Sequence, residues 1–343
     1  MATLPDQHVR TRLPVRAPIQ PMLAKAMDHI PSGPADAWAY EPKLDGFRGI
    51  VVVNGDRGVD LHSRRGARLN ETFPEIVWSA FDHVPAGTVL DGEIVRWGAS
   101  GRLDFTALHR RNIAGRRRAA SMARTEPCHF AAFDVVRVRG RDVSGLPLRE
   151  RRALLEELFA PIPAAGVLAL GMHTTDEAEA RIWYETLHVA GVEGLVCKPT
   201  RSTYDFGVRG WVKVKRRTSS DAVVGGYVGS PRRPSGLLAR YDAGGRLRVV
   251  GRTTQLSKQA AAELAPLLTP AGAGHPWPQT LPPGWASSPY GQRDPISYHQ
   301  VQPTLVVEVL VDTAQDYGHR HRHAVRYLRV RADLHPMQLD PID

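Results

Sequence analysis

Short runs of apolar and β-branched residues predict strands at many places in the first two thirds of the chain. Residues 39–65 contain two such runs around Asn54-Gly55, a dipeptide that strongly favours a hairpin turn. Four more strands are expected at 88–97, 129–138, 194–198 and 210–215. Because these hairpins are mixed with helical segments, the pattern indicates an α+β fold with largely antiparallel sheets.

Three segments of the same region have the periodicity of amphipathic helices. Thr72 and Glu75 have the spacing of a capping box, which predicts a helix that begins there and continues to about Phe81. Longer helical patterns occupy residues 148–159 and 176–190. We therefore expect helices to be packed against the antiparallel sheets.

The pattern changes after residue 218. Short strands bounded by glycine flank one helix and a proline-rich stretch from Pro266 to Pro295, which we interpret as a long loop. The strands are expected at 222–228, 237–242, 247–252, 304–312 and 324–331, with the helix at 257–268. About five short strands with one helix predict a small all-β barrel of OB type. The expected domains are therefore 1–218 and 219–343.

Composition narrows the class of protein. A chain of 343 residues that is 42% apolar suits two globular domains, and no stretch has the length and character of a signal peptide or a membrane span. Cys128 and Cys197 are the only cysteines, which excludes a disulfide framework or a cysteine-based zinc site and favours a reducing cytoplasm. A net charge of +10 predicts a polyanionic partner.

Lysine is rare in this basic chain. Only six of its 45 basic residues are lysines, so arginine is the usual surface cation. A position that keeps lysine can supply an amine that loses its proton and attacks, which a guanidinium cannot do. The lysines in chemically suggestive segments are Lys43, Lys198, Lys213 and Lys215.

One segment with such a lysine begins an ordered series of motifs. Residues 43–48 (KLDGFR) have the form K-x-D-G-x-R, a match expected by chance about four times in a thousand for this composition. The motifs that follow are Ser63-Arg64, Asp91-Gly92-Glu93, Phe133-Asp134, 193–198 (EGLVCK) and 211–215 (WVKVK). Taken alone, Glu93 and Glu193 could be carboxylates of edge strands, and Phe133 an ordinary core aromatic.

This order resembles that of the covalent nucleotidyltransferases, which include DNA ligases, RNA ligases and mRNA-capping enzymes. The resemblance spans residues from about 20 to 331. Residues 21–24 (PMLA), Phe133 and the ending Trp211-x-Lys213-x-Lys215 look most like DNA ligases. The compact two-domain layout is similar to that of the bacterial C-type ATP-dependent DNA ligases.

The resemblance implies that Lys43 attacks the α-phosphorus of ATP and forms a lysyl-AMP phosphoramidate. The attacking amine must be neutral, so neighbouring cations and a metal are expected to lower the pKa of Lys43. Glu41 would accept a hydrogen bond from the adenine amino group and favour ATP over GTP. Arg48 and Arg64 would bind ribose and phosphate oxygens. Arg65 is adjacent to Arg64, and the choice of Arg64 rests on the Ser-Arg pair of the family.

The same resemblance implies a Mg²⁺ site, in which Mn²⁺ may substitute, at Glu93 and Glu193. Glu93 would alternatively bind the ribose hydroxyls, and Phe133 would stack on the purine. The residues expected to neutralise the triphosphate are Arg209, Lys213 and Lys215, placed on one face by strand alternation, with Lys198 as a weaker candidate.

The last family motif is less regular in this chain. The family usually shows Arg-x-Pro there, whereas this chain has Arg322-His323-Ala324. We assign the arginine that orients pyrophosphate to Arg322, with Arg320 as the alternative. His319, His321 and His323 alternate and could instead hold a metal, but no fourth ligand is evident.

Arginine clusters suggest the partner. Arg110-Arg111 and 116–118 flank a loop expected at 112–115, and together with other basic pairs they could line a groove for duplex phosphates. The resemblance implies a monomeric DNA ligase that seals nicked duplex DNA, with a repair role and possible repair-protein partners. The rival hypotheses are an RNA ligase, a GTP-using capping enzyme and a non-catalytic nucleic-acid-binding OB protein.

Overall fold

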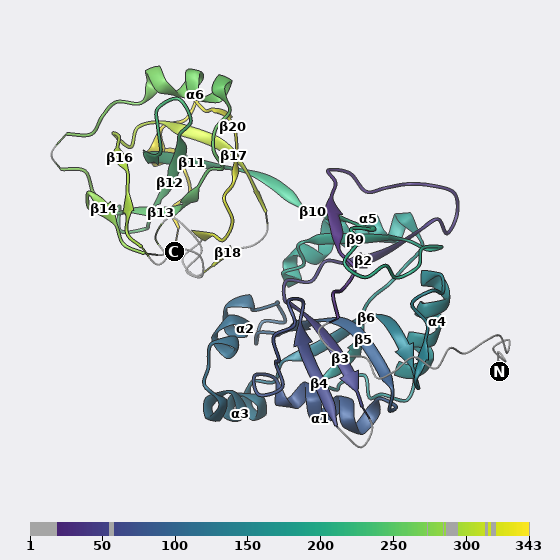
Figure 1. Cartoon of the computed structure of the whole chain (residues 1–343). Helices are drawn as coiled ribbons and strands as arrows, with labels where there is room; N and C mark the ends of the chain where they lie inside the picture. The colour runs from purple at the N-terminus through teal and green to yellow at the C-terminus, as the bar shows by residue number, and fades with distance from the viewer. Residues whose placement is uncertain are drawn as a thin grey trace. The chain divides into compact units, whose positions relative to one another are not determined.

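The computed structural model describes residues 19–54, 58–272, 274–283, 285, 294–312, 315–316 and 320–342. The chain divides into two compact units, the first ending at Lys215 and the second beginning at Arg216 (Figure 1). The sequence places this change slightly later, near residue 219, which lies inside the first strand of the second unit. No helix among the described residues is long and apolar enough to cross a membrane.

The first unit contains two sheets. The larger has the strand order β4-β3-β5-β6-β7, with β8 paired to β6. Its strands are β3 (Phe47–Val53), β4 (Val59–Ser63), β5 (Thr88–Val95), β6 (His129–Val138), β7 (Arg141–Asp142) and β8 (Leu168–Leu170). All of these pairings are antiparallel except β6 with β8. The hairpin of β3 and β4 confirms the pairing predicted around Asn54, whereas Gly55 lies outside the described residues.

The smaller sheet of the first unit has the order β1-β10-β9-β2. Its strands are β1 (Ala24–Ala26), β2 (Trp38–Pro42), β9 (Gly194–Pro199) and β10 (Trp211–Lys215). The ladders β2–β9 and β9–β10 are antiparallel, and β1 joins β10 in parallel. This sheet therefore aligns segments that are more than 150 residues apart in sequence.

Helices cover these sheets because one face of each helix is apolar. The helices are α1 (Pro74–His83), α2 (Phe105–Asn112), α3 (Arg116–Thr125), α4 (Leu148–Phe159), α5 (Glu177–Thr186) and the 3₁₀ turn η2 (Leu187–Ala190). Ile76 of α1 and Leu155 of α4 belong to the same buried cluster as Val51 and Phe130 of the larger sheet. Ala180 of α5 packs in the core of the smaller sheet.

A separate apolar cluster combines residues of both sheets. It contains Ile50 of β3, Val89 of β5, Val136 of β6 and Trp211 of β10. Because strand side chains alternate, Val51 faces the helices of the larger sheet while Ile50 faces this second cluster. Both faces of β3 are thus buried, which fixes the register of the segment that follows Lys43.

The capping box predicted at Thr72 is wrong. Helix α1 begins at Pro74, and no side chain of the described chain caps its N-terminal residue, Phe73. Glu75 is buried and accepts hydrogen bonds from the Arg111 guanidinium at 2.9 Å and the Cys128 N–H at 2.9 Å. The carboxylate thus pairs with a distant arginine instead of closing a local cap.

The second unit is built on an antiparallel sheet of order β13-β12-β11-β17-β20, with β16 also paired to β11. The strands of this sheet are β11 (Arg217–Val228), β12 (Ser235–Tyr241), β13 (Leu247–Arg252), β16 (His299–Gln300), β17 (Val306–Asp312) and β20 (Arg326–Val330). Two separate two-stranded sheets pair β14 (Thr280–Leu281) with β15 (Ile296–Ser297) and β18 (Gln315–Asp316) with β19 (Arg320–His321). A bridge between Thr253 and Val325 joins the two ends of the sheet's strand order.

One α-helix packs inside this second unit. Helix α6 (Lys258–Leu264) begins after Ser257, whose hydroxyl accepts from the Ala260 N–H, and continues as the 3₁₀ turn η3 (Ala265–Leu267). A last 3₁₀ turn is η4 (Pro336–Gln338). The proline-rich stretch is more than a loop, since it contains β14 and the buried Trp277, whose indole donates to the Leu247 carbonyl at 2.8 Å.

Candidate active site

Lys43 lies directly after β2, where the β2–β9 ladder continues for one more pair. Its N–H donates to the Gly194 carbonyl at 2.8 Å, and the Glu193 N–H donates back to the Lys43 carbonyl at 2.9 Å. These reciprocal bonds hold the two side chains together, and the Lys43 ammonium forms an ion pair with the Glu193 carboxylate. The Lys43 side chain is 22% exposed and that of Glu193 only 4%. The Lys43 side chain is therefore partly exposed to solvent, whereas the carboxylate that it contacts is buried.

Two more lysines converge on the same carboxylate. Lys215 Nζ lies 3.3 Å from Glu193 Oε2. Lys213 and Lys215 are the partly exposed residues of β10, and Val212 and Val214, which alternate with them, are buried. Burial, followed by the charges of Lys43 and Lys215, lowers the pKa of Lys213. Strand alternation thus places both lysines beside Lys43, as the sequence predicts.

Arg209 does not share this strand. It precedes the first residue of β10, Trp211, so the alternation that places the lysines does not extend to it. Its side chain donates at 3.4 Å to the Ala24 carbonyl. The strand argument for Arg209 therefore fails, although the residue remains a candidate for binding the triphosphate.

The pKa of Lys43 is shifted in the direction opposite to the one expected. Burial lowers the pKa, but the charge and hydrogen bond of Glu193 and the charge of Glu93 outweigh burial and raise it. The resemblance implies a lowered pKa because it places both cations and a metal around the amine. Instead, the carboxylates hold Lys43 protonated in the nucleotide-free protein.

Glu93 lies on β5 directly opposite Arg48 of β3. Burial raises the pKa of Glu93 to about 7, although the charges of Lys43 and Arg48 oppose the shift. The turn that follows Lys43 packs closely on β5, because a Cβ atom on Gly46 would lie 2.3 Å from the Ile94 carbonyl oxygen. Only glycine fits there, which explains its place in the K-x-D-G-x-R segment.

Arg48 is held by Asp91, a residue for which the sequence motifs predict no role. Its guanidinium forms a two-pronged ion pair with the buried Asp91 and donates to the Met22 carbonyl at 3.1 Å. The Tyr204 hydroxyl also donates to Asp91 and accepts from the Met22 N–H at 3.1 Å. Alternation along β5 puts Asp91 and Glu93 on one face, a signal that could have identified Asp91. No sequence signal points to Tyr204.

Phe133 is half-buried beside Trp211, with ring centroids 6.0 Å apart. The Arg48 guanidinium lies 4.6 Å from the centroid of the Phe133 ring, and Lys198 Nζ lies 4.5 Å from it. Cations over an aromatic face are stabilised by its negative quadrupole. The structure thus brings Phe133 into the site together with Arg48.

Lys198 is not available to neutralise a triphosphate. It is fully buried, its ammonium lies 2.7 Å from Glu41 Oε2, and it donates to the Phe133 carbonyl at 3.2 Å. The β2–β9 register explains the pair, because Glu41 is opposite Val196 and its diagonal neighbour on β9 is Lys198. The prediction that Lys198 neutralises the triphosphate is therefore wrong, and Lys198 is instead a partner of Glu41.

Glu41 is buried, with one oxygen close to Lys198 and the other in a longer ion pair with His173. Burial raises its pKa, but the Lys198 charge and the contacts of His173 outweigh burial and lower it. Glu41 Oε1 makes no hydrogen bond within the described part of the chain, and His173 Nδ1 lies 3.5 Å from it. The sequence gives no signal for His173, which is 132 residues away.

Comparison with known proteins identifies the family. Residues 21–215 match the family described as the ATP dependent DNA ligase domain. The chain belongs to this family. It is 35% identical to DNA ligase C of Mycobacterium tuberculosis, over 95% of this chain and 93% of that protein. It is 34% identical to DNA ligase C2 of Mycolicibacterium smegmatis, over 94% of this chain and 92% of that one.

Solved structures support the fold of the ligase. A structure titled as an analysis of Lig E DNA ligases that bind DNA with a minimal scaffold aligns with 90% of this chain and 99% of its own, with a TM-score of 0.53 and 16% identity. The protein is an enzyme that joins DNA with ATP, as predicted, and neither the RNA-ligase nor the non-catalytic hypothesis is favoured.

Two of the predicted site residues, Arg64 and Arg322, are not placed beside Lys43 by any contact among the described residues of the first unit. Arg64 is exposed in the turn after β4. Arg322 belongs to the second unit of the ligase, between β19 and β20, and is 9% exposed, whereas Arg320 lies in β19. His319 is outside the described residues, and the residues that are described contain no cluster of metal-binding side chains.

The arginine cluster of the ligase divides into one buried residue and several exposed ones. Arg111 is 1% exposed and donates to Glu75 and, at 2.8 Å, to the Glu126 carbonyl, so it fastens α2 and α3 to α1. This removes Arg111 from the predicted phosphate groove. The exposed members are Arg110, Arg116, Arg117 and Arg118.

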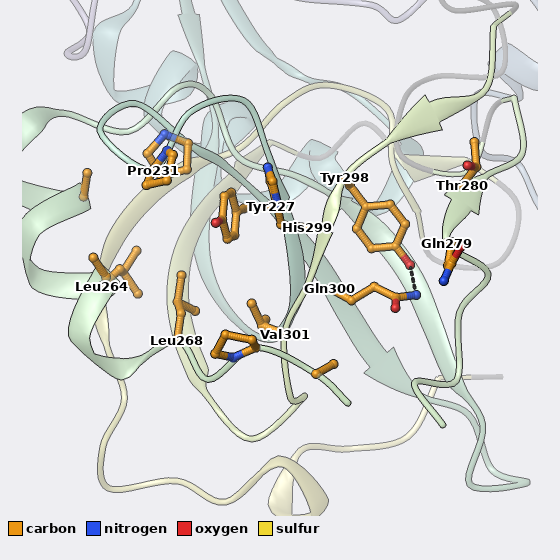
Figure 2. A pocket seen from close by; sticks show the side chains of 15 residues that line it. Tyr227, Pro231, Leu264, Leu268, Gln279, Thr280, Tyr298, His299, Gln300 and Val301 are labelled. Carbon is orange, nitrogen blue, oxygen red and sulfur yellow. Dashed lines mark hydrogen bonds between the residues drawn. The ribbon is translucent and has the colours of Figure 1, made fainter. Parts of the chain in front are cut away.

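The second unit of the ligase has a cavity of about 600 Å³ that contains none of the predicted site residues. Figure 2 shows it between the α6 side, with Leu264 and Leu268, and the segment that carries Tyr298 and Gln300. The Tyr227 and His299 rings stack in it with centroids 4.7 Å apart. Among the described residues that line the cavity there is no acidic or lysine side chain, so this lining does not resemble a triphosphate site.

Proposed function

We propose that this ligase seals nicks between a 3′-hydroxyl and a 5′-phosphate in duplex DNA, through AMP carried on Lys43, in DNA repair. The observation that carries the proposal is the pairing of Lys43 and Lys215 with the buried Glu193, with Lys213 near enough to act electrostatically on the same group. Three amines around one carboxylate give an excess of positive charge beside Lys43. That arrangement suits a triphosphate that is to be attacked at its α-phosphorus.

The reaction has three displacements at phosphorus. The neutral Lys43 amine attacks the α-phosphorus of ATP, a P–N bond forms, and pyrophosphate leaves with Lys213 and Lys215 beside it. The 5′-phosphate of the nick then attacks the same phosphorus and breaks the P–N bond. Finally the 3′-hydroxyl attacks the adenylated 5′-phosphate, and AMP leaves as the phosphodiester forms.

The carboxylates fit a magnesium ion, or manganese in its place. Glu93 and Glu193 both act electrostatically on Lys43, and Mg²⁺ commonly binds one or two carboxylates together with phosphate oxygens. Once bound, the metal would neutralise phosphate charge and take over the carboxylate that holds Lys43 protonated. The chain's own contribution is the Lys43–Glu193 pair: when Glu193 binds the metal, Lys43 loses the partner that holds it protonated and can release its proton.

The remaining assignments concern nucleotide binding. Glu41 would accept from the adenine amino group, since its Oε1 is buried and lacks a hydrogen bond within the described chain. Phe133 would stack on the purine, and Arg48 and Arg64 would bind ribose and phosphate oxygens. Arg209 would contact the triphosphate from the loop before β10.

The second unit would serve as an OB-type domain. Support comes from its antiparallel sheet, whose terminal strands are linked by the Thr253–Val325 bridge, and from the single α-helix of its described part. Arg322 would orient the pyrophosphate during the first step. The protein would act as a monomer in the cytoplasm, which is consistent with the buried free thiols of Cys128 and Cys197.

The exposed arginines of α2 and α3 would bind the phosphates of nicked duplex DNA. Residues 110–125 contain six arginines and no acidic residue, and only Arg111 among them is buried. A surface of this kind binds the DNA backbone without reading its sequence, as a nick-sealing enzyme requires.

The test of the proposal is transfer of label from ATP to the protein. Wild-type protein incubated with Mg²⁺ and ATP labelled at the α-phosphate should keep the label on a denaturing gel. Lys43→Arg should lose it entirely while remaining folded, because a guanidinium stays protonated and cannot attack. Lys258→Arg, at the start of α6, is the matched control and should be labelled normally. Label on Lys43→Arg at the wild-type level would disprove the nucleophile assignment.

A further inference from the structure

Two buried polar atoms face each other beside the smaller sheet of the first unit. Glu41 Oε1 and His173 Nδ1 contact each other in a long ion pair of 3.5 Å, and neither atom meets the geometry of a hydrogen bond to any described residue. Their side chains are only 6% and 13% exposed. A buried polar atom without a good hydrogen bond costs about 1–3 kcal/mol, so a buried pair held only by a long contact suggests a ligand that completes both atoms.

The backbone fixes both side chains in place. Tyr40 and Thr174 form an isolated bridge, in which the Tyr40 N–H donates to the Thr174 carbonyl at 2.8 Å and the Thr174 N–H donates back at 3.0 Å. Glu41 and His173 are the neighbours of this bridge. Lys198 holds the other oxygen of Glu41 at 2.7 Å. The free oxygen is therefore oriented in advance and does not need to reorganise to bind.

The pair offers one acceptor next to one potential donor. Ionised Glu41 can only accept, and its pKa is lowered in this environment. A neutral imidazole with its proton on Nδ1 can only donate from that atom. The ligand edge that complements them has a donor next to an acceptor. Adenine has that edge, because its 6-amino group is flanked by the ring nitrogens N1 and N7, whereas guanine has a carbonyl at the same position.

We propose that His173 Nδ1 donates a hydrogen bond to an adenine ring nitrogen beside the amino group that Glu41 binds, so that the two residues together select ATP. This inference rests on the proposed placement of ATP next to Lys43 and extends it to a residue outside every sequence motif. His173 becomes a specificity-determining residue. It reaches the site through the Tyr40–Thr174 bridge and not through the motif strands.

Equilibrium binding of ATP analogues tests the proposal without catalysis. The full-length Lys43→Ala variant cannot be adenylated, so the affinities of ATP, 1-deaza-ATP and 7-deaza-ATP can be compared in it. Each deaza analogue replaces one ring nitrogen with C–H. One of the two should bind about tenfold more weakly than ATP, the factor expected for about 1.4 kcal/mol from one hydrogen bond. His173→Ala in the same background should bind ATP and that analogue equally.

Each outcome bears on the proposal. His173→Gln, which keeps a side-chain N–H, should restore part of the preference for ATP, while His62→Ala, a change at another histidine with buried unpaired nitrogens, should leave it intact. If His173→Ala weakens ATP and both analogues by the same factor, His173 only supports Glu41 and the proposal fails. Label transfer to wild-type Lys43 is measured separately, so failure here is distinguishable from failure of the proposed function.

Discussion

At the scale of single residues, the carboxylates around Lys43 set the protonation of the site. Glu93 has a pKa of about 7 in the folded, nucleotide-free protein because it is buried, against 4.5 for an ordinary glutamate. The folded state therefore prefers the protonated form. The stability that Glu93 contributes is complete below pH 4.5 and is lost as the pH rises to about 7.

Replacing Glu93 by glutamine should remove this loss, since glutamine stays neutral at every pH. The free energy of unfolding of Glu93→Gln relative to wild type should rise by up to about 3 kcal/mol between about pH 5 and pH 8. Urea titrations without nucleotide or metal measure the difference at each pH. A difference that is flat across this range would show that Glu93 is ionised throughout and would contradict the raised pKa.

The sequence predicts which motif residues share the site, but it does not predict the residues that reach the site from outside the motifs. Lys43, Glu193 and Lys215 meet because their strands are neighbours, which the ordered motifs anticipate. His173 and Tyr204 approach through long-range contacts that no local periodicity records. The raised pKa of Lys43 was also missed, because it depends on distances to carboxylates and not on their presence in the chain.

At the scale of elements, helices α2 and α3 form a basic hairpin, and the buried ion pair of Arg111 with Glu75 joins it to α1. Arg111→Ala should leave the Glu75 carboxylate buried and uncompensated, which costs about 3–5 kcal/mol of stability. Arg117→Ala should change stability by less than about 0.5 kcal/mol because its side chain is exposed. It should instead weaken DNA binding and reduce the slope of log K against log salt by about 0.9.

Thermal unfolding and DNA titrations at several salt concentrations separate the two arginines. A stability loss in Arg117→Ala, or an unchanged salt slope, would contradict the assignment of the exposed face to phosphate binding. An unaltered melting temperature in Arg111→Ala would mean that the hairpin does not depend on Glu75.

Helices and strands are predictable from the sequence where the apolar periodicity alone determines their bounds. Helix α4 has the bounds that its pattern predicts, because Leu148, Leu155 and Phe159 bury one face without competing partners. The cap of α1 was not predictable, since Glu75 satisfies a distant guanidinium that the local spacing does not reveal. The proline-rich stretch departs from the expected loop for a similar reason, because Trp277 anchors it in a core.

At the scale of the whole molecule, the division of labour between the two units can be tested with Arg322. Its side chain is 9% exposed, so Arg322→Ala needs a melting curve beside every rate. We expect the variant to form enzyme-AMP slowly from ATP, yet to seal a nick that already carries a 5′-adenylate at close to the wild-type rate. Single-turnover assays of both steps measure this, with Arg320→Ala for comparison. Equal slowing of both steps in a folded variant would refute the assignment.

The large-scale organisation followed from composition and motif order. The excess of arginine and the net charge of +10 indicated a polyanion, and the ligase family binds DNA. The boundary between units was placed slightly late, because β11 begins at Arg217 in a run of polar residues that reads as a linker. Polar sequence alone does not distinguish a linker from an exposed strand.

The Lys43–Glu193 ion pair also affects the chemical reactivity of the resting enzyme. An ammonium is inert toward aldehydes, acyl donors and other electrophiles, so the amine destined to carry AMP is shielded from adventitious modification before the nucleotide arrives. Lys213, whose pKa is lowered, is expected to react with such reagents more readily. If Lys43 carries AMP as proposed, the carboxylate that keeps its amine protonated also protects it between turnovers.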